Sequence, residues 1–162
     1  HPSICIPPLL GWYTDIMTTE NRKNAHSVFL CDYHFVFCTK YRRAVINAGL
    51  GSYLKQRAYE LTEHYPTIVI KAINTDRDHI HLLVSLPPTM SPGSFVRLYK
   101  TNSSHNIKKQ FEFLQKVYYR TDSLWSSGYF VSTVGINQET IQNYIRHQGK
   151  EDLGQTATLF EM

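Results

Sequence analysis

The sequence predicts an α+β fold, a single domain in which helices pack on an antiparallel β-sheet. Segments rich in β-branched and aromatic residues follow one another across short turns, as in residues 67–86, where two apolar runs flank the turn Asp76–Asp78. Segments with apolar residues at helical spacing lie between these strands. Short turns join antiparallel neighbours, so hairpins with interspersed helices indicate an antiparallel sheet.

The first half of the chain supplies a strand, a helix and a hairpin. Residues 27–43 predict one long strand that ends in a basic cluster. Residues 49–64 predict a helix whose buried side is formed by Leu50, Leu54, Ala58 and Leu61. Residues 67–76 then predict a strand, and the strand that begins at His79 completes a hairpin with it.

The second half predicts two further helices around one strand. Ser91 is the expected N-cap of a helix over residues 91–111, with Pro92 at its first position and Phe95, Leu98 and Ile107 facing inward. Residues 128–135 predict a strand bounded by glycines, in which Tyr129, like Trp125 before it, is expected in the core. Asn137 is the expected cap of a last helix that ends near Gly149.

Composition and length bound the class of protein. The chain has 162 residues with 42% hydrophobic residues, which suits one globular domain with a real core. Its net charge of +4 is a mild bias towards polyanionic partners. Cys5, Cys31 and Cys38 form no CxxC pair and are expected to be buried thiols of a reducing compartment. We therefore expect a cytoplasmic protein without a membrane span.

The domain is expected to occupy residues 26–150. Residues 1–25 are expected to be an N-terminal extension, since the first methionine, Met17, is a plausible natural start. Residues 151–162 are expected to be a C-terminal tail.

His79 and His81 are the first candidate functional residues. In a strand, residues i and i+2 share a face, so the two imidazoles can converge on one metal ion. Two histidines are an incomplete ligand set, and His81 as a satisfied core residue with His79 at a strand end is an equally good interpretation of the spacing alone. Asp78 can accept a hydrogen bond from the pair or serve as a turn residue, and the turn is the simpler assignment.

Tyr144 and Gln148 lie four residues apart on the last predicted helix and therefore share one face. A tyrosine hydroxyl becomes a useful nucleophile when a divalent cation polarises the group under attack, and Gln148 offers the oxygen ligand that magnesium accepts. Periodicity alone favours a simpler interpretation, in which Tyr144 extends the apolar face of Ile141 and Ile145.

Basic residues gather in three places. Lys40, Arg42 and Arg43 surround Tyr41 at the end of the first strand, which suits phosphates and bases, or equally a solubility cluster on an edge strand. Lys100, Lys108 and Lys109 are expected on one outward helix face that either contacts DNA phosphates or is only solvated, and Arg146 either holds a phosphate beside Tyr144 or lies on the surface.

These residues resemble a known family. The segment "HIHLL" resembles the His-hydrophobic-His motif of the HUH endonucleases, and "YIRHQ" resembles the Tyr-x-x-x-Gln helix of small single-tyrosine, TnpA-type transposases. Further segments resemble the family in the same order: "YHFVFCTKYRRAVI", "DHIHLLVSLPP", "SFVRLYKTNSS" and "LWSSGYFVSTVG". The resemblance covers roughly residues 26–150 and implies an HUH-type, ferredoxin-like sheet with the nucleophile on a C-terminal helix.

The resemblance also implies an activity. His79, His81 and Gln148 would bind Mg²⁺ or Mn²⁺, and Tyr144 would attack single-stranded DNA to give a 5′-phosphotyrosine. The implied substrate carries hairpins near the ends of an insertion sequence. The implied enzyme is a homodimer in which the tyrosine helix of one subunit completes the active site of the other.

Two alternatives stay open at this point. A domesticated relative that processes repeat hairpins would share every motif. A non-catalytic, metal-stabilised DNA-binding module would differ, because it has no need of Tyr144 in register with Gln148.

Overall fold

The computed structural model describes residues 21–134, which fall into two units. In the first unit, a short hairpin pairs β1 (Arg22–Lys23) with β2 (Val28–Phe29). The side-chain oxygen of Asn24 closes its turn by accepting hydrogen bonds from the backbone nitrogens of His26 and Ser27. The second unit, residues 31–134, contains the main sheet and its helices.

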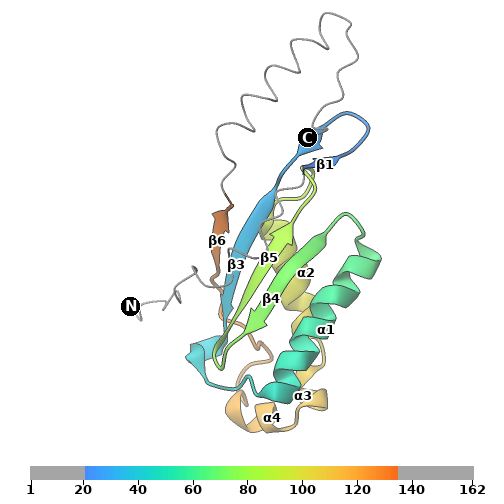
Figure 1. Cartoon of the computed structure of the whole chain (residues 1–162). Coiled ribbons are helices and arrows are strands. Elements are labelled where there is room, and N and C mark those ends of the chain that lie inside the picture. The colour runs from blue at the N-terminus through green and yellow to red at the C-terminus, as the bar shows by residue number, and fades with distance from the viewer. Residues whose placement is uncertain (1–20, 135–162) are drawn as a thin grey trace, which may run out of the picture. The chain divides into compact units, whose positions relative to one another are not determined.

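The main sheet has four antiparallel strands in the order β4-β5-β3-β6 (Figure 1). The strands are β3 (Asp32–Cys38), β4 (Val69–Thr75), β5 (His79–Ser85) and β6 (Phe130–Thr133). The predicted hairpin is confirmed, since β4 and β5 pair across the turn at residues 76–78. The α+β class with an antiparallel sheet is confirmed as well.

Register divides the two central strands into a core face and a histidine face. Phe37 pairs with Ile80, and both are fully buried in the hydrophobic core. Val36 pairs with His81, so these side chains lie on the opposite face. Alternation therefore sends the two histidines of β5 away from the core.

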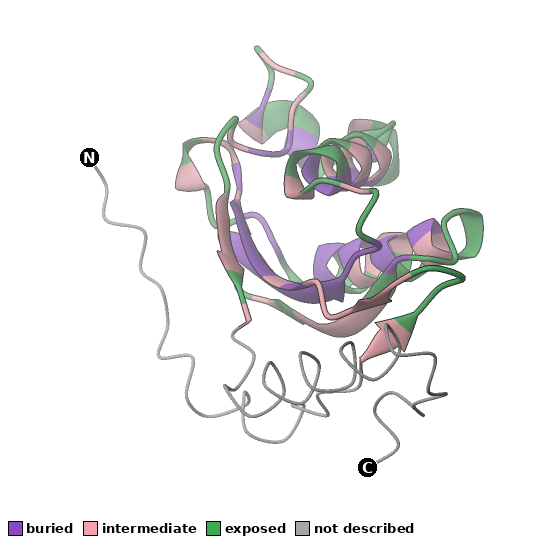
Figure 2. Cartoon of the chain, turned by 90° about the horizontal axis from the view of Figure 1, so that it is seen from above, coloured by how far each residue is buried: buried purple, intermediate pink, exposed green. Residues whose placement is uncertain are grey.

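Two helices pack on the core face. They are α1 (Ala48–His64) and α2 (Pro92–Ser104), and their buried residues face the central strands (Figure 2). The side chain of Asn47 caps α1 by accepting from the backbone nitrogen of Leu50, and Ser91 caps α2 in the same way through Ser94. The predicted cap at Ser91 and the predicted buried side of α1 are confirmed.

Aromatic side chains fill the space between sheet and helices. The ring of Phe35 lies 4.9 Å from that of Phe95, and the ring of Phe37 lies 5.6 Å from that of Tyr99. Tyr99 donates its hydroxyl to the carbonyl oxygen of Leu54 over 3.1 Å, which ties α2 to α1. Trp125 is buried, as predicted.

The first predicted strand is wrong in its extent. Residues 27–43 divide into β2, β3 and a 3-10 turn, η1 (Lys40–Arg42). The cause lies at Tyr41 and Arg42, whose φ angles are 58° and 49°. Non-glycine residues seldom adopt this left-handed region, at a cost of about 1–3 kcal/mol each, and extended pairing cannot continue through it.

The predicted helix over residues 91–111 is also interrupted. It ends at Ser104, and α3 (Ile107–Gln110) and α4 (Phe113–Val117) follow as separate short helices. Asn106 has a φ of 55°, a conformation that asparagine tolerates and that a right-handed helix does not contain. Lys100 therefore lies on a different helix from Lys108 and Lys109.

Three smaller expectations differ from the structure or fall outside it. Tyr129 is 43% exposed and is therefore not a core residue. Cys31 and Cys38 are free thiols, as expected, but half-buried rather than buried. The helix predicted from Asn137 lies outside the described residues.

We expect Phe35→Ala to lower the free energy of unfolding by about 3–5 kcal/mol, because it leaves a cavity among fully buried aromatic rings. Urea denaturation followed by circular dichroism would measure the loss. The matched control is Tyr119→Ala, since Tyr119 is 71% exposed and its truncation should change stability by less than about 0.5 kcal/mol. Equal losses in the two variants would contradict this assignment of the core.

Candidate active site

The histidine pair lies at the start of β5, in the interior of the sheet. The rings of His79 and His81 are 4.8 Å apart, centroid to centroid, and stand nearly perpendicular at 79°. His79 is 8% exposed and His81 4%, so both imidazoles are withdrawn from bulk water. The shared face that the sequence predicts is therefore present, with Ile80 between them in the core.

Asp78 fixes which ring nitrogen of His79 carries a proton. Its Oδ1 lies 2.6 Å from His79 Nδ1. An ionised carboxylate can only accept a hydrogen bond, so Nδ1 holds a proton, and in the neutral ring the lone pair is on Nε2. Nε2 is buried and has no hydrogen-bond partner within residues 21–134. Asp78 is a turn residue, as predicted, and it also accepts a hydrogen bond from His79, so both interpretations of this residue hold.

Arg42 holds Asp78 from the other side. Its guanidinium lies 3.3 Å from Asp78 Oδ2. Burial alone would raise the pKa of Asp78, but the hydrogen bond and charge of His79, together with Arg42, outweigh burial and lower it. The carboxylate therefore stays ionised, and a chain of contacts runs from Arg42 through Asp78 to His79.

His34 is a third histidine on this face that sequence reasoning missed. It lies on β3, fully buried, with its ring stacked 5.5 Å from that of His81 at an angle of 10°. Its position beside His81 follows from strand register, in which Val36 opposes His81, and no short motif marks it. His34 is therefore the third ring of a histidine cluster that extends from β3 to β5.

Both inner histidines favour the neutral form. Burial, reinforced by the charges of His79 and His34, lowers the pKa of His81 to about 4, and burial also lowers the pKa of His34. Neutral imidazole is the form that ligates metals. A set of buried imidazole nitrogens, one of them oriented by a carboxylate, fits a divalent cation that completes its shell from elsewhere.

The other residues predicted for metal binding and catalysis are not among residues 21–134. Within residues 21–134, no cluster of three or more His, Cys, Asp and Glu side chains could hold a metal. Tyr144, Arg146 and Gln148 lie outside the described residues. Their roles as nucleophile, phosphate contact and third ligand stay predictions.

The basic turn lies beside the histidine pair. Thr39 donates its backbone N–H to the carbonyl oxygen of Asp78 over 2.9 Å, which joins the turn to the residue before His79. β3 has neighbours on both sides, so the interpretation of Lys40, Arg42 and Arg43 as an edge-strand cluster is wrong. Arg42 is bound to Asp78, and Arg43 is exposed.

The three lysines predicted on one helix face have separate environments. Lys100 Nζ donates to the carbonyl oxygens of Ser126 and Gly128, each over 2.8 Å, and burial lowers its pKa. Lys108 donates to the carbonyl oxygen of Tyr118. Only Lys109 of the three is exposed, so the expected single outward helix face is wrong, and phosphate contacts by these lysines stay a prediction.

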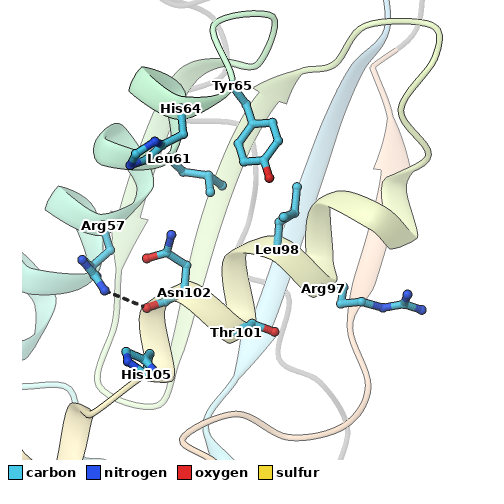
Figure 3. A pocket seen from close by; sticks show the side chains of 9 residues that line it. All are labelled: Arg57, Leu61, His64, Tyr65, Arg97, Leu98, Thr101, Asn102 and His105. Carbon is cyan, nitrogen blue, oxygen red and sulfur yellow. Dashed lines mark hydrogen bonds between the residues drawn. The ribbon is translucent and has the colours of Figure 1, made fainter.

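A hollow lies between α1 and α2, on the helical side of the sheet (Figure 3). It has a volume of about 810 Å³ and is lined by Arg57, Leu61, His64, Tyr65, Arg97, Leu98, Thr101, Asn102 and His105. The guanidinium of Arg57 is bound to Glu60 and to the carbonyl oxygen of Asn102. None of the predicted site residues lines this hollow, and the histidine pair belongs to the opposite face of the sheet.

Comparison with known proteins assigns the class. The family model described as "Transposase IS200 like" matches residues 27–148. The transposase of insertion sequence element IS200 from Salmonella typhimurium is 37% identical over 137 residues, which span 82% of this chain and 86% of the relative. The ISDra2 transposase TnpA of Deinococcus radiodurans is 28% identical over 134 residues, which span 82% of this chain and 94% of that protein.

Solved structures agree with this fold. A crystal structure assigned as a transposase from Deinococcus radiodurans R1 matches with a TM-score of 0.62 and 25% identity, over 78% of this chain and 97% of that one. A REP-associated tyrosine transposase bound to a REP hairpin matches in fold, with a TM-score of 0.51 and 12% identity, over 82% of this chain and 73% of that one.

The antiparallel sheet and the length of the match define a transposase, an enzyme that cleaves DNA strands and transfers them. The chain belongs to the IS200-like transposase family. In residues 21–134, no helix has the length and apolar character needed to cross a bilayer.

Acidification should destabilise the protein between pH 6.5 and about 4. In that window the unfolded chain protonates His81 and the folded chain does not, so unfolding takes up a proton and stability falls as pH falls. NMR titration of the His81 ring should show a largely neutral ring at pH 5. Urea denaturation at pH 7 and pH 5 should show that His81→Asn loses less stability on acidification than the wild type does. An equal loss of stability in the two proteins would contradict the lowered pKa of His81.

Proposed function

We propose that this transposase cleaves and rejoins single-stranded DNA through a covalent phosphotyrosine at Tyr144. The observation that carries the proposal is the oriented pair on β5, where Asp78 fixes the tautomer of His79 and burial keeps His81 neutral. A surface that only binds DNA has no need of two adjacent buried imidazoles, one of them oriented by a carboxylate. The spacing of Tyr144 and Gln148 on a predicted helix supplies the complementary groups.

The proposed metal is Mg²⁺ or Mn²⁺, held by His79, His81 and Gln148. When bound, such an ion polarises the scissile phosphate and stabilises the charge on the leaving oxygen. Asp78 and Arg42 would keep the Nε2 lone pair of His79 directed at the ion.

The proposed reaction needs no external energy source. The hydroxyl oxygen of Tyr144 attacks the phosphorus atom, the P–O3′ bond breaks, and the proton of the hydroxyl passes to the departing 3′ oxygen by way of solvent. The products are a 5′-phosphotyrosine and a free 3′-hydroxyl. In the second step a 3′-hydroxyl from another cleaved end attacks the phosphotyrosine, which restores the tyrosine and joins the strands.

Basic residues of the chain are proposed to hold the DNA backbone. Lys40 and Arg43 lie on the turn that adjoins Asp78, and Lys109 is exposed on α3. Arg146, two residues beyond Tyr144, is proposed to contact a phosphate. Lys100 and Lys108, whose ammonium groups donate to backbone carbonyls, would contribute less. Such contacts are sensitive to salt and carry little sequence information.

The proposed substrate is a strand with hairpins near the ends of an insertion sequence. The relative at 37% identity is a transposase of an insertion sequence element, which supports this role over that of a domesticated relative. A protein of the same fold was solved bound to a REP hairpin. We further propose a homodimer in which the tyrosine helix of one subunit completes the active site of the other; this rests on the family resemblance.

A covalent-trapping assay tests the nucleophile. Wild type incubated with a labelled single strand that carries an element-end hairpin should form a protein–DNA adduct with Mg²⁺ and none with EDTA. Tyr144→Phe removes the attacking oxygen, so the adduct should disappear while hairpin binding remains. Tyr119→Phe, at an exposed tyrosine, is the matched control and should react as wild type does. An adduct in Tyr144→Phe, or strand binding without cleavage under any divalent ion, would refute the proposal.

The contact between Asp78 and His79 should also affect metal affinity. Asp78→Ala frees the His79 tautomer and should weaken Mn²⁺ binding about 10- to 100-fold, as is usual when a carboxylate behind a ligating histidine is removed. Electron paramagnetic resonance of free Mn²⁺ would measure the affinity without DNA. Glu63→Ala is the control, because Glu63 is an exposed carboxylate on α1, on the opposite face of the sheet from the histidine pair. Equal affinity in Asp78→Ala and wild type would contradict the proposed role.

A further inference from the structure

Tyr41 is the most unusual residue beside the candidate active site. Its backbone adopts a φ of 58°, Arg42 follows with 49°, and its ring is 71% exposed. Two consecutive side-chain-bearing residues in this region are costly, and the conformation persists only where the surroundings enforce it. Here the enforced conformation turns a large aromatic ring out to solvent rather than into the core.

The surroundings of this turn hold it firmly. Lys40 donates its backbone N–H to the carbonyl oxygen of Leu124 over 2.8 Å and accepts from the hydroxyl of Tyr118 over 2.8 Å. Thr39 Oγ1 donates to the carbonyl oxygens of Arg43 and Asp78. The Tyr41 ring is therefore displayed by a clamped backbone, so that stacking a partner on it would cost little conformational entropy.

A small hollow adjoins the same turn. Its volume is about 270 Å³, and it is lined by Lys40 and Lys100 together with several hydroxyl side chains. Within residues 21–134, the hydroxyls of Thr101, Ser126 and Ser127 donate no hydrogen bond, so they can donate to an anion. The hollow is large enough for a phosphate group, and no carboxylate lines it.

Lys40 links the two features. It lines the hollow, and its Nζ lies 5.7 Å from the centroid of the Tyr41 ring. A nucleotide needs both elements at this spacing: a cation with hydroxyl donors for its phosphate, and an aromatic face for its base. Thr39, the residue before Lys40, is hydrogen-bonded to Asp78, so the turn and the hollow lie beside the histidine pair.

We propose that the turn and the hollow form a nucleotide subsite, in which Tyr41 stacks on an unpaired base and the hollow binds an adjacent phosphate. The inference rests on the proposed function, because it assigns a place to the single strand next to the site of cleavage. Stacking on a π-face is tolerant of sequence, so the subsite positions the strand rather than reading it.

The test compares binding of two probes in EDTA, where no cleavage occurs. One is a fluorescein-labelled oligothymidylate, and the other is an abasic strand of the same length. Tyr41→Asn removes the ring and tolerates positive φ, so it should weaken oligothymidylate binding roughly 5- to 100-fold and leave the abasic strand unaffected. Tyr41→Phe should bind as wild type does, and Tyr41→Gly is a second ring deletion that relieves backbone strain.

Matched controls separate the ring from the charge. Tyr119→Asn alters a tyrosine of equal exposure, 71%, and should change nothing. Lys40→Gln should weaken both probes and reduce the slope of log affinity against log salt by about one. Unchanged oligothymidylate binding in Tyr41→Asn, or equal losses on both probes, would overturn the inference. These binding measurements do not depend on the Tyr144 adduct, so the nucleotide subsite and the proposed nucleophile can each fail alone.

Discussion

The pairing of β3 with β5 is the constraint on which the rest of the structure depends. It sets Phe37 against Ile80 on one face and Val36 against His81 on the other, so a single register fixes both the core and the histidine face. A slip of one residue would bury His79 and His81 under the helices and turn the core residues outward. Fold and candidate site therefore have the same cause, because the register that buries apolar residues on one face also brings the histidines together on the other.

The site is built from neighbours in space that are distant in sequence. Asp78 precedes His79 directly, but Arg42 comes from the turn after β3, and His34 from the middle of β3. Asp78 orients His79, and burial lowers the pKa of His81 and favours its neutral form. Such preorganisation would reduce the reorganisation needed for the proposed binding of a metal and a phosphate.

The sequence predicted those parts of the fold that depend on local chemistry. Periodicity and capping predict four features that the structure confirms. They are the α+β class, the hairpin of β4 and β5, the cap at Ser91 and the buried side of α1. The shared face of His79 and His81 follows from strand alternation alone.

The rest depends on tertiary contacts that no local pattern encodes. Clamping contacts enforce the positive φ of Tyr41, which ends the strand that composition would extend. Lys100 looks like a surface lysine, but it donates to backbone carbonyls that lie more than twenty positions further along the chain. The stacking of His34 on His81 needed the strand register.

The most direct test of the central claim, a metal site on β5, is anomalous diffraction from crystals soaked in Mn²⁺. The account predicts a manganese peak in contact with His79 Nε2 and with a ring nitrogen of His81, while Asp78 stays bonded to His79 Nδ1. Manganese bound elsewhere, or a His79 ring turned so that Nδ1 faces the metal, would contradict it.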